Sequence, residues 1–177
     1  MILHYKTVDK NYRYFGQVKH LYEHAFPSAE RPSFSMLLSL DNNKLYGVEE
    51  FGKLVGLVSV VECGDLLYIF FLAVKKSMRE HGYGSKILAD ILDEYQDKRV
   101  FLLAEDPSIP CPNKEERNKR INFYNHNGLY QNDVTIVEYG VQYVLLSNDR
   151  TVNKNDFLKV MEVVTGDFYP IYISNVK

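Results

Sequence analysis

An arginine and two glycines follow an apolar, strand-like run at a spacing that suits phosphate binding. Arg79, Gly82 and Gly84 lie in the segment A-V-K-K-S-M-R-E-H-G-Y-G-S, residues 73–85. Glycine has no Cβ atom, so phosphate oxygens can approach the main chain there. The first amides of a helix are unpaired and lie at the positive end of its dipole, which favours anions. We therefore predict a pyrophosphate site to which Arg79 adds a charged contact.

Two better-known phosphate-binding patterns do not fit this segment. A dinucleotide fingerprint needs G-x-G-x-x-G, and the stretch from Gly82 to Ile87 has no third glycine. The Walker pattern G-x-x-x-x-G-K-[ST] is absent from the sequence. The remaining alternative is a plain glycine-bearing turn between a strand and a helix, with Arg79 in solvent.

The elements that must position this loop are a buried strand and an amphipathic helix. Leu66–Val74 is an almost unbroken apolar run, which is typical of a strand buried on both faces. After the loop, apolar residues recur at helical spacing from Ile87 to Tyr95, with acidic residues on the other face. Val100–Ala104 is a second apolar strand, and a right-handed crossover makes it parallel to the first.

The other elements follow from apolar periodicity and from turn residues. Val134–Leu146 is expected to be one strand with a bulge or bend at Gly140. The remaining expected elements are a strand Ile2–Val8, helices Tyr14–Phe26, Phe34–Leu40 and Asp156–Val164, and a hairpin of Tyr46–Phe51 and Leu54–Glu62 that turns at Gly52-Lys53.

A second motif lies further along the chain. The segment I-N-F-Y-N-H-N-G-L-Y, residues 121–130, is predicted to end a helix that begins near Asn113. Asn113 and Glu116 have the spacing of a capping box, and residues 127–128 suit a left-handed helix end. Together, R-x-x-G-x-G and F-Y-x-x-x-G-L resemble the motifs of the GCN5-related N-acetyltransferase (GNAT) superfamily over roughly residues 48–146.

The resemblance implies a single α/β domain over residues 1–177, with a mixed, mostly antiparallel sheet of six or seven strands flanked by helices. A central parallel pair of strands would splay apart, with the pantetheine arm of acetyl-CoA in the gap. The residues implied to bind this cofactor are Phe71, Leu72, Ala73, Val74, Arg79, Glu80, His81, Gly82, Tyr83, Gly84 and Ser85.

The resemblance also implies an acetyl-CoA-dependent N-acetyltransferase whose amine acceptor attacks directly in a ternary complex. Tyr124 is the predicted general acid, because a phenol of pKa about 10 can give a proton to a departing thiolate whose thiol has a pKa of about 8.5. The alternative is that Tyr124 only packs the helix end beside Phe123. The alternative function is a non-catalytic CoA-binding regulatory module on the same fold.

The general base and the acceptor site are predicted from fewer signals. Glu105 follows the second apolar strand, and strand ends face the crevice in open α/β sheets, so it could act as base or anchor the ammonium. The alternative is an exposed acid. Glu30 and Phe34 lie in the segment that rims the acceptor site in the family, although Glu30 could instead pair with Arg31.

The sequence departs from the common family pattern on the motif helix. Many members carry Asn and Ala where this chain has Arg117 and Arg120. Either arginine could reach the phosphates of CoA, or both could be solvated, so neither is assigned to the site.

The composition excludes several classes of protein. The chain has 177 residues, of which 46% are hydrophobic and 25% charged, which suits one globular domain. Dispersed basic residues, with a net charge of −2, argue against a nucleic-acid partner, and no apolar run suits a membrane span or signal peptide. Cys63 and Cys111 suggest neither a disulfide framework nor a metal site, so we expect a cytoplasmic protein without metal.

The identity of the acceptor does not follow from the sequence. A small-molecule amine and a protein amino group are both compatible with the family resemblance. The aromatic C-terminal strand and tail could mediate a homodimer or could cover the core.

Overall fold

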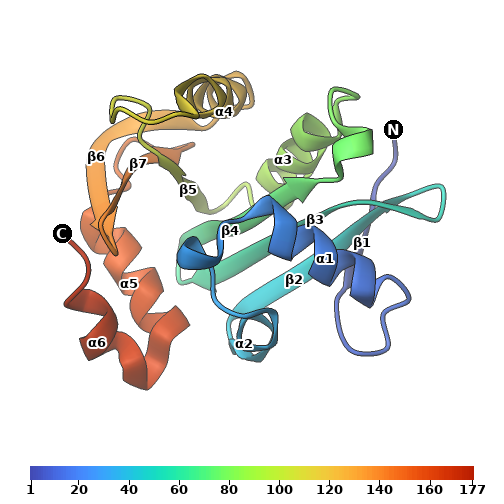
Figure 1. Ribbon diagram of the computed structural model, residues 1–177, viewed down its shortest axis with the longest axis horizontal. Coiled ribbons are helices and arrows are strands. Elements are labelled where there is room, and N and C mark those ends of the chain that lie inside the picture. The colour runs from blue at the N-terminus through green and yellow to red at the C-terminus, as the bar shows by residue number, and fades with distance from the viewer. The chain divides into compact units, whose positions relative to one another are not determined.

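The computed structural model in Figure 1 describes residues 1–177, apart from the side chain of Ala29. The strands are β1 His4–Thr7, β2 Asn43–Glu50, β3 Lys53–Cys63, β4 Leu66–Val74, β5 Arg99–Glu105, β6 Tyr130–Glu138 and β7 Val141–Ser147. The helices are α1 Phe15–Ala25, α2 Phe34–Ser39, α3 Tyr83–Glu94, α4 Lys114–His126, α5 Lys154–Thr165 and α6 Tyr169–Ile173, with 3₁₀ turns η1 Ser28–Glu30, η2 Lys76–Met78 and η3 Gly166–Phe168.

The strands form a seven-stranded sheet in the order β1-β2-β3-β4-β5-β7-β6. Strands β4 and β5 pair in parallel, with Leu66–Tyr68 opposite Arg99–Phe101, as the crossover predicts. The pairs β1–β2, β2–β3, β5–β7 and β6–β7 are antiparallel. The expected mixed α/β architecture is therefore confirmed. The chain folds into two compact units, one of residues 1–61 and 69–94 and the other of residues 62–68 and 95–177.

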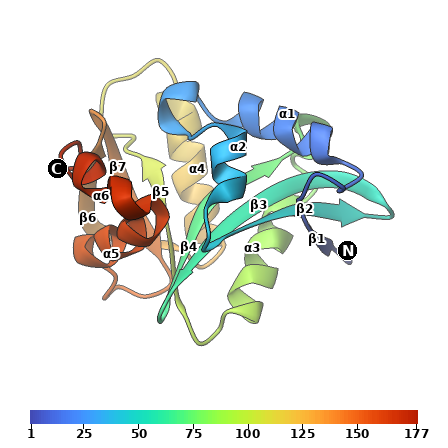
Figure 2. The ribbon, with the colours of Figure 1, turned by 90° about the horizontal axis from the view of Figure 1, so that it is seen from below.

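In the first unit, helices cover both faces of β2, β3 and β4. Helices α1 and α2 lie on one face and α3 lies on the other (Figure 2). Tyr22, Leu37 and Phe71 belong to the core between α1, α2 and the strands. The predicted cap of α2 is confirmed, because the Ser33 hydroxyl accepts a hydrogen bond from the Met36 amide at 3.2 Å.

The hairpin of β2 and β3 turns one residue earlier than predicted. Glu50 pairs with Lys53, so Phe51 and Gly52 form the turn. Both have positive φ, 47° and 72°, as a type I′ turn requires. The predicted turn Gly52-Lys53 is therefore wrong. Asparagine or aspartate is the usual residue before glycine in such turns, and here an aromatic residue takes that place.

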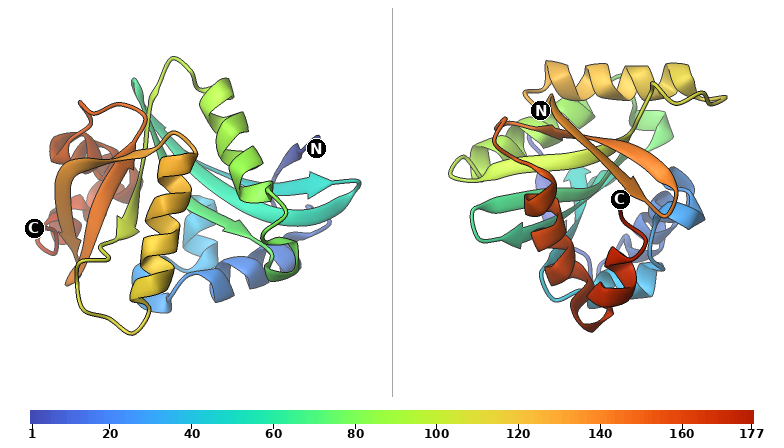
Figure 3. Two further views of the ribbon diagram at one scale, coloured as in Figure 1. Left: turned by 90° about the horizontal axis from the view of Figure 1, so that it is seen from above. Right: turned by 90° about the vertical axis from the view of Figure 1, so that its left-hand side faces the viewer.

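In the second unit, α4 lies on one face of strands β5, β7 and β6, and α5 and α6 lie on the other (Figure 3). The fully buried side chains here include Phe101, Leu145 and Phe157. The ring of Tyr68 stacks on Phe101, with 4.9 Å between centroids, and meets Phe157 edge-on at 6.0 Å. These contacts join α5 to the paired stretch of β4 and β5.

The segment expected to be one strand is a hairpin. Glu138 pairs with Val141 across a turn of Tyr139 and Gly140. Their φ angles, 48° and 82°, are again those of a type I′ turn. Two consecutive left-handed residues reverse the chain, whereas a bulge would only bend it. The expected bend at Gly140 is thus a complete reversal that creates β6 and β7.

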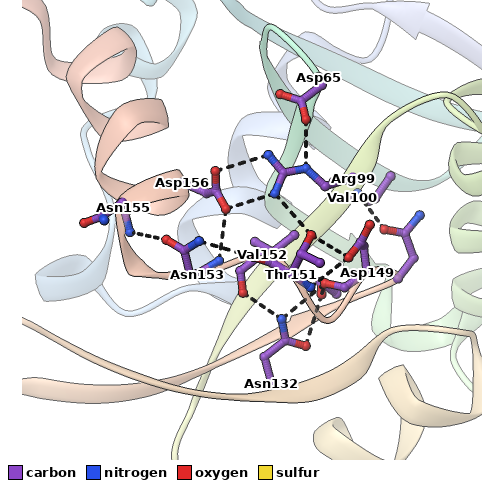
Figure 4. A network of polar contacts seen from close by, with 12 residues as sticks. Asp65, Arg99, Val100, Asn132, Asp149, Thr151, Val152, Asn153, Asn155 and Asp156 are labelled. Atoms are coloured by element: carbon purple, nitrogen blue, oxygen red, sulfur yellow. Dashed lines mark hydrogen bonds and ion pairs between the residues drawn. The ribbon is translucent and has the colours of Figure 1, made fainter.

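A polar network fixes the start of α5 (Figure 4). Arg99 on β5 donates two hydrogen bonds to Asp156, at 3.0 and 3.2 Å, and one to Asp65 at 2.8 Å. Asp156 also forms a capping box with Asn153 at the beginning of α5. The network therefore ties α5 both to β5 and to the turn before β4.

Candidate active site

The predicted phosphate loop lies at the surface of the first unit, between β4 and α3. Arg79, Glu80, His81 and Gly82 are exposed. Gly82 has a φ of 81°, and a Cβ atom added there would meet no described heavy atom within 4 Å. Neither packing nor a tight contact within the protein requires glycine at this position. The backbone conformation and the open space suit the close approach of a phosphate oxygen.

Helix α3 presents its first turn to this open space. The amide of Lys86 donates to the carbonyl of Gly82 at 3.0 Å, which closes the first turn. The amides of the preceding helical residues, Tyr83 to Ser85, have no acceptor within the helix. Tyr83 is anchored, because its hydroxyl donates to Glu50 on β2 and its side chain is only 9% exposed. The position of these amides is therefore fixed by the packing of the unit.

Arg79 is held beside the loop by its own backbone contacts. Its Nε donates to the carbonyl of Val74 at 3.3 Å, and the Nδ1 of His81 lies 2.6 Å from the Arg79 carbonyl oxygen. Among the described residues, none accepts a hydrogen bond from the two Nη groups of Arg79. Those groups form a planar fork that matches the geometry of a phosphate.

The end of β4 combines buried side chains with a tightly packed backbone. The Phe71 ring lies 5.0 Å from the Tyr22 ring and 4.8 Å from the Phe26 ring, centroid to centroid, so it belongs to the core. A Cβ atom on Gly56 of β3 would lie 2.6 Å from the carbonyl oxygen of Ala73. The sequence analysis did not single out Gly56. Its apolar surroundings gave no signal of this close approach.

Tyr124 lies in the last turn of α4, in the second unit. The helix ends as predicted with Gly128 at a φ of 85°. The amide of Leu129 donates to the Tyr124 carbonyl at 3.0 Å and the amide of Gly128 to the Asn125 carbonyl at 3.4 Å, which is a Schellman motif. The predicted capping box at the start of α4 is wrong: among the described residues, none gives the Asn113 side chain a capping hydrogen bond.

The phenol of Tyr124 is half-buried and remains protonated at neutral pH. Burial raises the pKa of Tyr124 above its ordinary value, while the nearby charge of Arg120 acts in the opposite direction. The centroid of its ring lies 5.3 Å from that of the Phe123 ring, which is the packing expected if Tyr124 only packs the helix end. Among the described side chains and carbonyls, none bonds to its hydroxyl, which leaves that proton available for donation.

Glu105 is bound by the two arginines that depart from the family pattern. Arg117 and Arg120 on α4 donate to different oxygens of its carboxylate, Arg120 at 3.0 Å. The Glu105 side chain is 11% exposed, so it is not the exposed acid of the alternative reading. Arg117 is neither solvated nor aimed at an external phosphate, because it also donates to the Asp106 carbonyl at 3.1 Å.

Comparison with known proteins identifies the family. Residues 7–114 match the model of the acetyltransferase (GNAT) family. This chain belongs to the GNAT family. The loop from Arg79 to Ser85 lies within the matched region, whereas Tyr124 lies beyond it.

Three solved structures show the same fold. A Bacteroides thetaiotaomicron protein described as a GNAT acetyltransferase aligns with a TM-score of 0.71 and 16% identity, over 96% of this chain and 98% of its own. A Bacillus subtilis acetyltransferase in complex with CoA aligns with a TM-score of 0.61 and 15% identity, over 84% of this chain and 99% of its own. A GNAT acetyltransferase from Elizabethkingia anophelis with acetyl-CoA bound aligns with a TM-score of 0.58 and 15% identity, over 82% of this chain and 95% of its own. Among curated proteins, none matches the chain.

In this GNAT chain, the two residues predicted to contact the acceptor have different surroundings. Phe34 is 4% exposed, and its ring packs against Phe15 at 5.5 Å and Tyr22 at 5.6 Å, so most of it is core. Glu30 ends the short 3₁₀ turn η1 and is half-buried. Arg31 donates to the Phe26 carbonyl at 3.0 Å, and its guanidinium lies over the Tyr22 ring.

Cys63 and Cys111 are free thiols. In the part of the chain that the structure describes, no group of three or more His, Cys, Asp and Glu side chains could hold a metal ion. A search of the same residues finds no helix with the length and apolar character needed to cross a bilayer.

Proposed function

We propose that this GNAT chain is an acetyl-CoA-dependent N-acetyltransferase that acetylates a primary amine by direct attack in a ternary complex. One observation carries the proposal: Gly82, with a φ of 81° and open space where its Cβ would be, directly precedes the unpaired amides of α3. The GNAT neighbours with bound CoA or acetyl-CoA support the same cofactor. Residues 1–177 would then act as one acyltransferase domain.

The loop and β4 would hold the cofactor along its length. The amides at the start of α3 would bind its pyrophosphate, and the Nη groups of Arg79 would add charge. Backbone groups of Phe71–Val74 would pair with the amides of its pantetheine arm as an added strand does. When bound, acetyl-CoA supplies an acetyl group on a thioester. An amide of Leu72–Val74 would polarise that carbonyl, an effect worth about 10²–10³ in rate.

Tyr124 would protonate the departing sulfur. Its raised pKa keeps the phenol in the proton-bearing form, and its hydroxyl is free of protein partners among the described residues. Tyr124 would give its proton to the sulfur as the carbon–sulfur bond breaks and the amine forms the new carbon–nitrogen bond. The proton that the amine loses then restores the phenol through solvent or a base.

Glu105 remains the proposed base or ammonium anchor, but Arg117 and Arg120 already occupy part of its carboxylate. A carboxylate has about four acceptor sites, and Arg117 and Arg120 take one on each oxygen. An ammonium hydrogen bond would therefore use a site that the arginines leave open. Glu30 would contribute to the rim of the acceptor site. Phe34 would support that rim from the core.

Product detection tests the proposal. The protein is incubated with acetyl-CoA and a panel of a polyamine, an amino acid, an aminoglycoside and a peptide with a free N-terminus. We expect N-acetylated product, seen by mass spectrometry, together with an equal amount of free CoA thiol from at least one amine. A protein whose melting temperature rises with CoA but which forms no product would instead be a CoA-binding module. Failure of both responses would exclude CoA as its ligand.

A further inference from the structure

The phosphate loop between β4 and α3 is attached to the β2–β3 hairpin at both of its ends. At its start, the amide of Lys75 donates to the carbonyl of Val55 on β3 at 2.9 Å. At its end, the hydroxyl of Tyr83 donates to the carboxylate of Glu50 on β2. The residues from Arg79 to Gly82, which lie between these two contacts, are exposed. The hairpin therefore supports a loop whose middle lies in solvent.

The side chain of Tyr83 turns into the protein, although the glycine before it lies at the surface. Tyr83 is 9% exposed, and a buried phenol needs a partner for its hydroxyl. Glu50 supplies that partner, and a hydrogen bond to an ionised acceptor is stronger than one between neutral groups. The same hydrogen bond raises the pKa of Tyr83, so the hydroxyl keeps its proton and remains the donor at neutral pH.

The end of β2 that carries Glu50 is itself held from the opposite face of the sheet. Glu49 and Glu50 are neighbours on a strand, so their side chains point to opposite faces, which carry α1 and α3 respectively (Figure 2). Tyr12 donates to one carboxylate oxygen of Glu49 at 2.8 Å, and Arg13 donates to the other. Arg13 also donates to the carbonyl of Gly52 in the hairpin turn at 3.2 Å. Glu50 therefore projects from a hairpin end that side chains fix on its other face.

We propose that Glu50 is a positioning residue for acetyl-CoA, which acts through Tyr83 to hold the first turn of α3 where its amides meet the diphosphate. The inference rests on the cofactor site of the proposed function. The amide of Tyr83 is one of those without an acceptor in the helix. One residue would thus bind the diphosphate with its main chain while its side chain is held by the carboxylate. Hydrogen bonds weaken steeply when their geometry changes, so a displaced first turn would lose affinity.

This positioning concerns only the diphosphate end of the cofactor. The pantetheine arm would instead pair with the backbone of Phe71–Val74, which belongs to a strand of the sheet. Loss of the contact between Tyr83 and Glu50 should therefore weaken the binding of CoA. It should leave the binding of pantetheine, which lacks the nucleotide and the phosphates, unchanged.

Calorimetric titration with CoA and with pantetheine tests the inference without any need for turnover. Tyr83→Phe removes the hydroxyl and keeps the ring. We expect its Kd for CoA to rise about tenfold, the effect of losing one charge-assisted hydrogen bond, while its Kd for pantetheine stays at the wild-type value. Glu50→Gln keeps an oxygen that can accept from Tyr83, so it should bind CoA more tightly than Tyr83→Phe does.

Tyr5→Phe is the matched control. The hydroxyl of Tyr5 on β1 donates to the carboxylate of Asp90 at 2.8 Å, so it is also a phenol bonded to an acid, with one partner on α3. Asp90 lies seven residues beyond Tyr83, about two helical turns from the loop. Tyr5→Phe should therefore leave the Kd for CoA unchanged, even where it lowers the melting temperature as much as Tyr83→Phe.

Three results would overturn the inference while leaving the proposed function intact. They are an unchanged Kd for CoA in Tyr83→Phe, an equal loss of affinity for CoA and pantetheine, and a rise in the Kd for CoA of the same size in Tyr5→Phe. The last would reduce both tyrosines to general supports of α3. The opposite combination is a wild-type protein that binds CoA more tightly than Tyr83→Phe but acetylates none of the amines. That result would keep the positioning role and remove the proposed function.

Discussion

Arg117 on α4 donates a hydrogen bond to Glu105 at the end of β5, and both side chains are almost buried, at 12% and 11% exposure. Arg120, one turn along the helix, bonds to the other carboxylate oxygen. The buried side chain of α4 is Ile121, so an apolar face does little to attach this helix. Ionic contacts therefore help to hold the helix that carries Tyr124.

Glu105→Gln should destabilise the protein, because it leaves the nearly buried Arg117 without a charged partner. We expect the free energy of unfolding to fall by about 1–3 kcal/mol, measured by urea denaturation. Glu162→Gln, in solvent on α5, should change it by less than about 0.5 kcal/mol. If Glu105 is also the base, the variant loses activity most at low pH. Unchanged stability would contradict the ionic attachment of α4, and unchanged activity at every pH would exclude the base.

Tyr124→Phe should lower kcat by about 10² or more while the KM for acetyl-CoA stays the same. Burial raises the Tyr124 pKa, so the phenol stays protonated up to a pH above the ordinary tyrosine pKa of about 10. An acid loses activity as pH rises through its pKa, so the wild-type profile should show no loss from this group below about pH 10. Tyr130→Phe, at a side chain that is 50% exposed, is the control. Equal kcat values for wild type and Tyr124→Phe would remove the assigned role.

Arg99→Gln should lower the melting temperature at pH 7 and flatten its dependence on pH. The hydrogen bond from Arg99 lowers the pKa of Asp65 from its ordinary 3.8. A lowered carboxyl pKa gives stability that is present above the unfolded value and is lost as pH falls through the folded value. The melting temperatures of wild type and variant should therefore converge as pH falls below the folded pKa of Asp65, which lies under 3.8. Arg150→Gln, at an exposed position, is the control, and parallel pH profiles for wild type and Arg99→Gln would count against this explanation.

The elements around the phosphate loop could be predicted because their signals are local. The apolar run of Leu66–Val74 coincides with β4. Gly82 and Gly128 mark positive φ at the ends of helices, where glycine alone is free of a steric penalty. Where a backbone conformation strongly favours one residue type, the sequence is sufficient to predict that conformation.

The parts that escaped prediction depend on contacts between distant residues. The partners of Glu105 follow it by 12 and 15 positions, so pattern reading left Arg117 and Arg120 unassigned. The hydrogen bond from Tyr172 to Glu138 joins residues that lie 34 positions apart, so it depends on the docking of α6 against β6. The turn at Tyr139-Gly140 was missed because an aromatic residue in a left-handed conformation has no common sequence signal.

Calorimetric titration of CoA into Gly82→Ala and Gly64→Ala tests most directly whether the diphosphate binds at the loop. Both glycines have positive φ, 81° and 61°, and neither would place a Cβ atom within 4 Å of a described heavy atom, so the backbone cost is similar. We predict that the Kd for CoA rises at least about tenfold for Gly82→Ala and stays at the wild-type value for Gly64→Ala. Wild-type affinity in both variants would contradict binding of CoA at this loop.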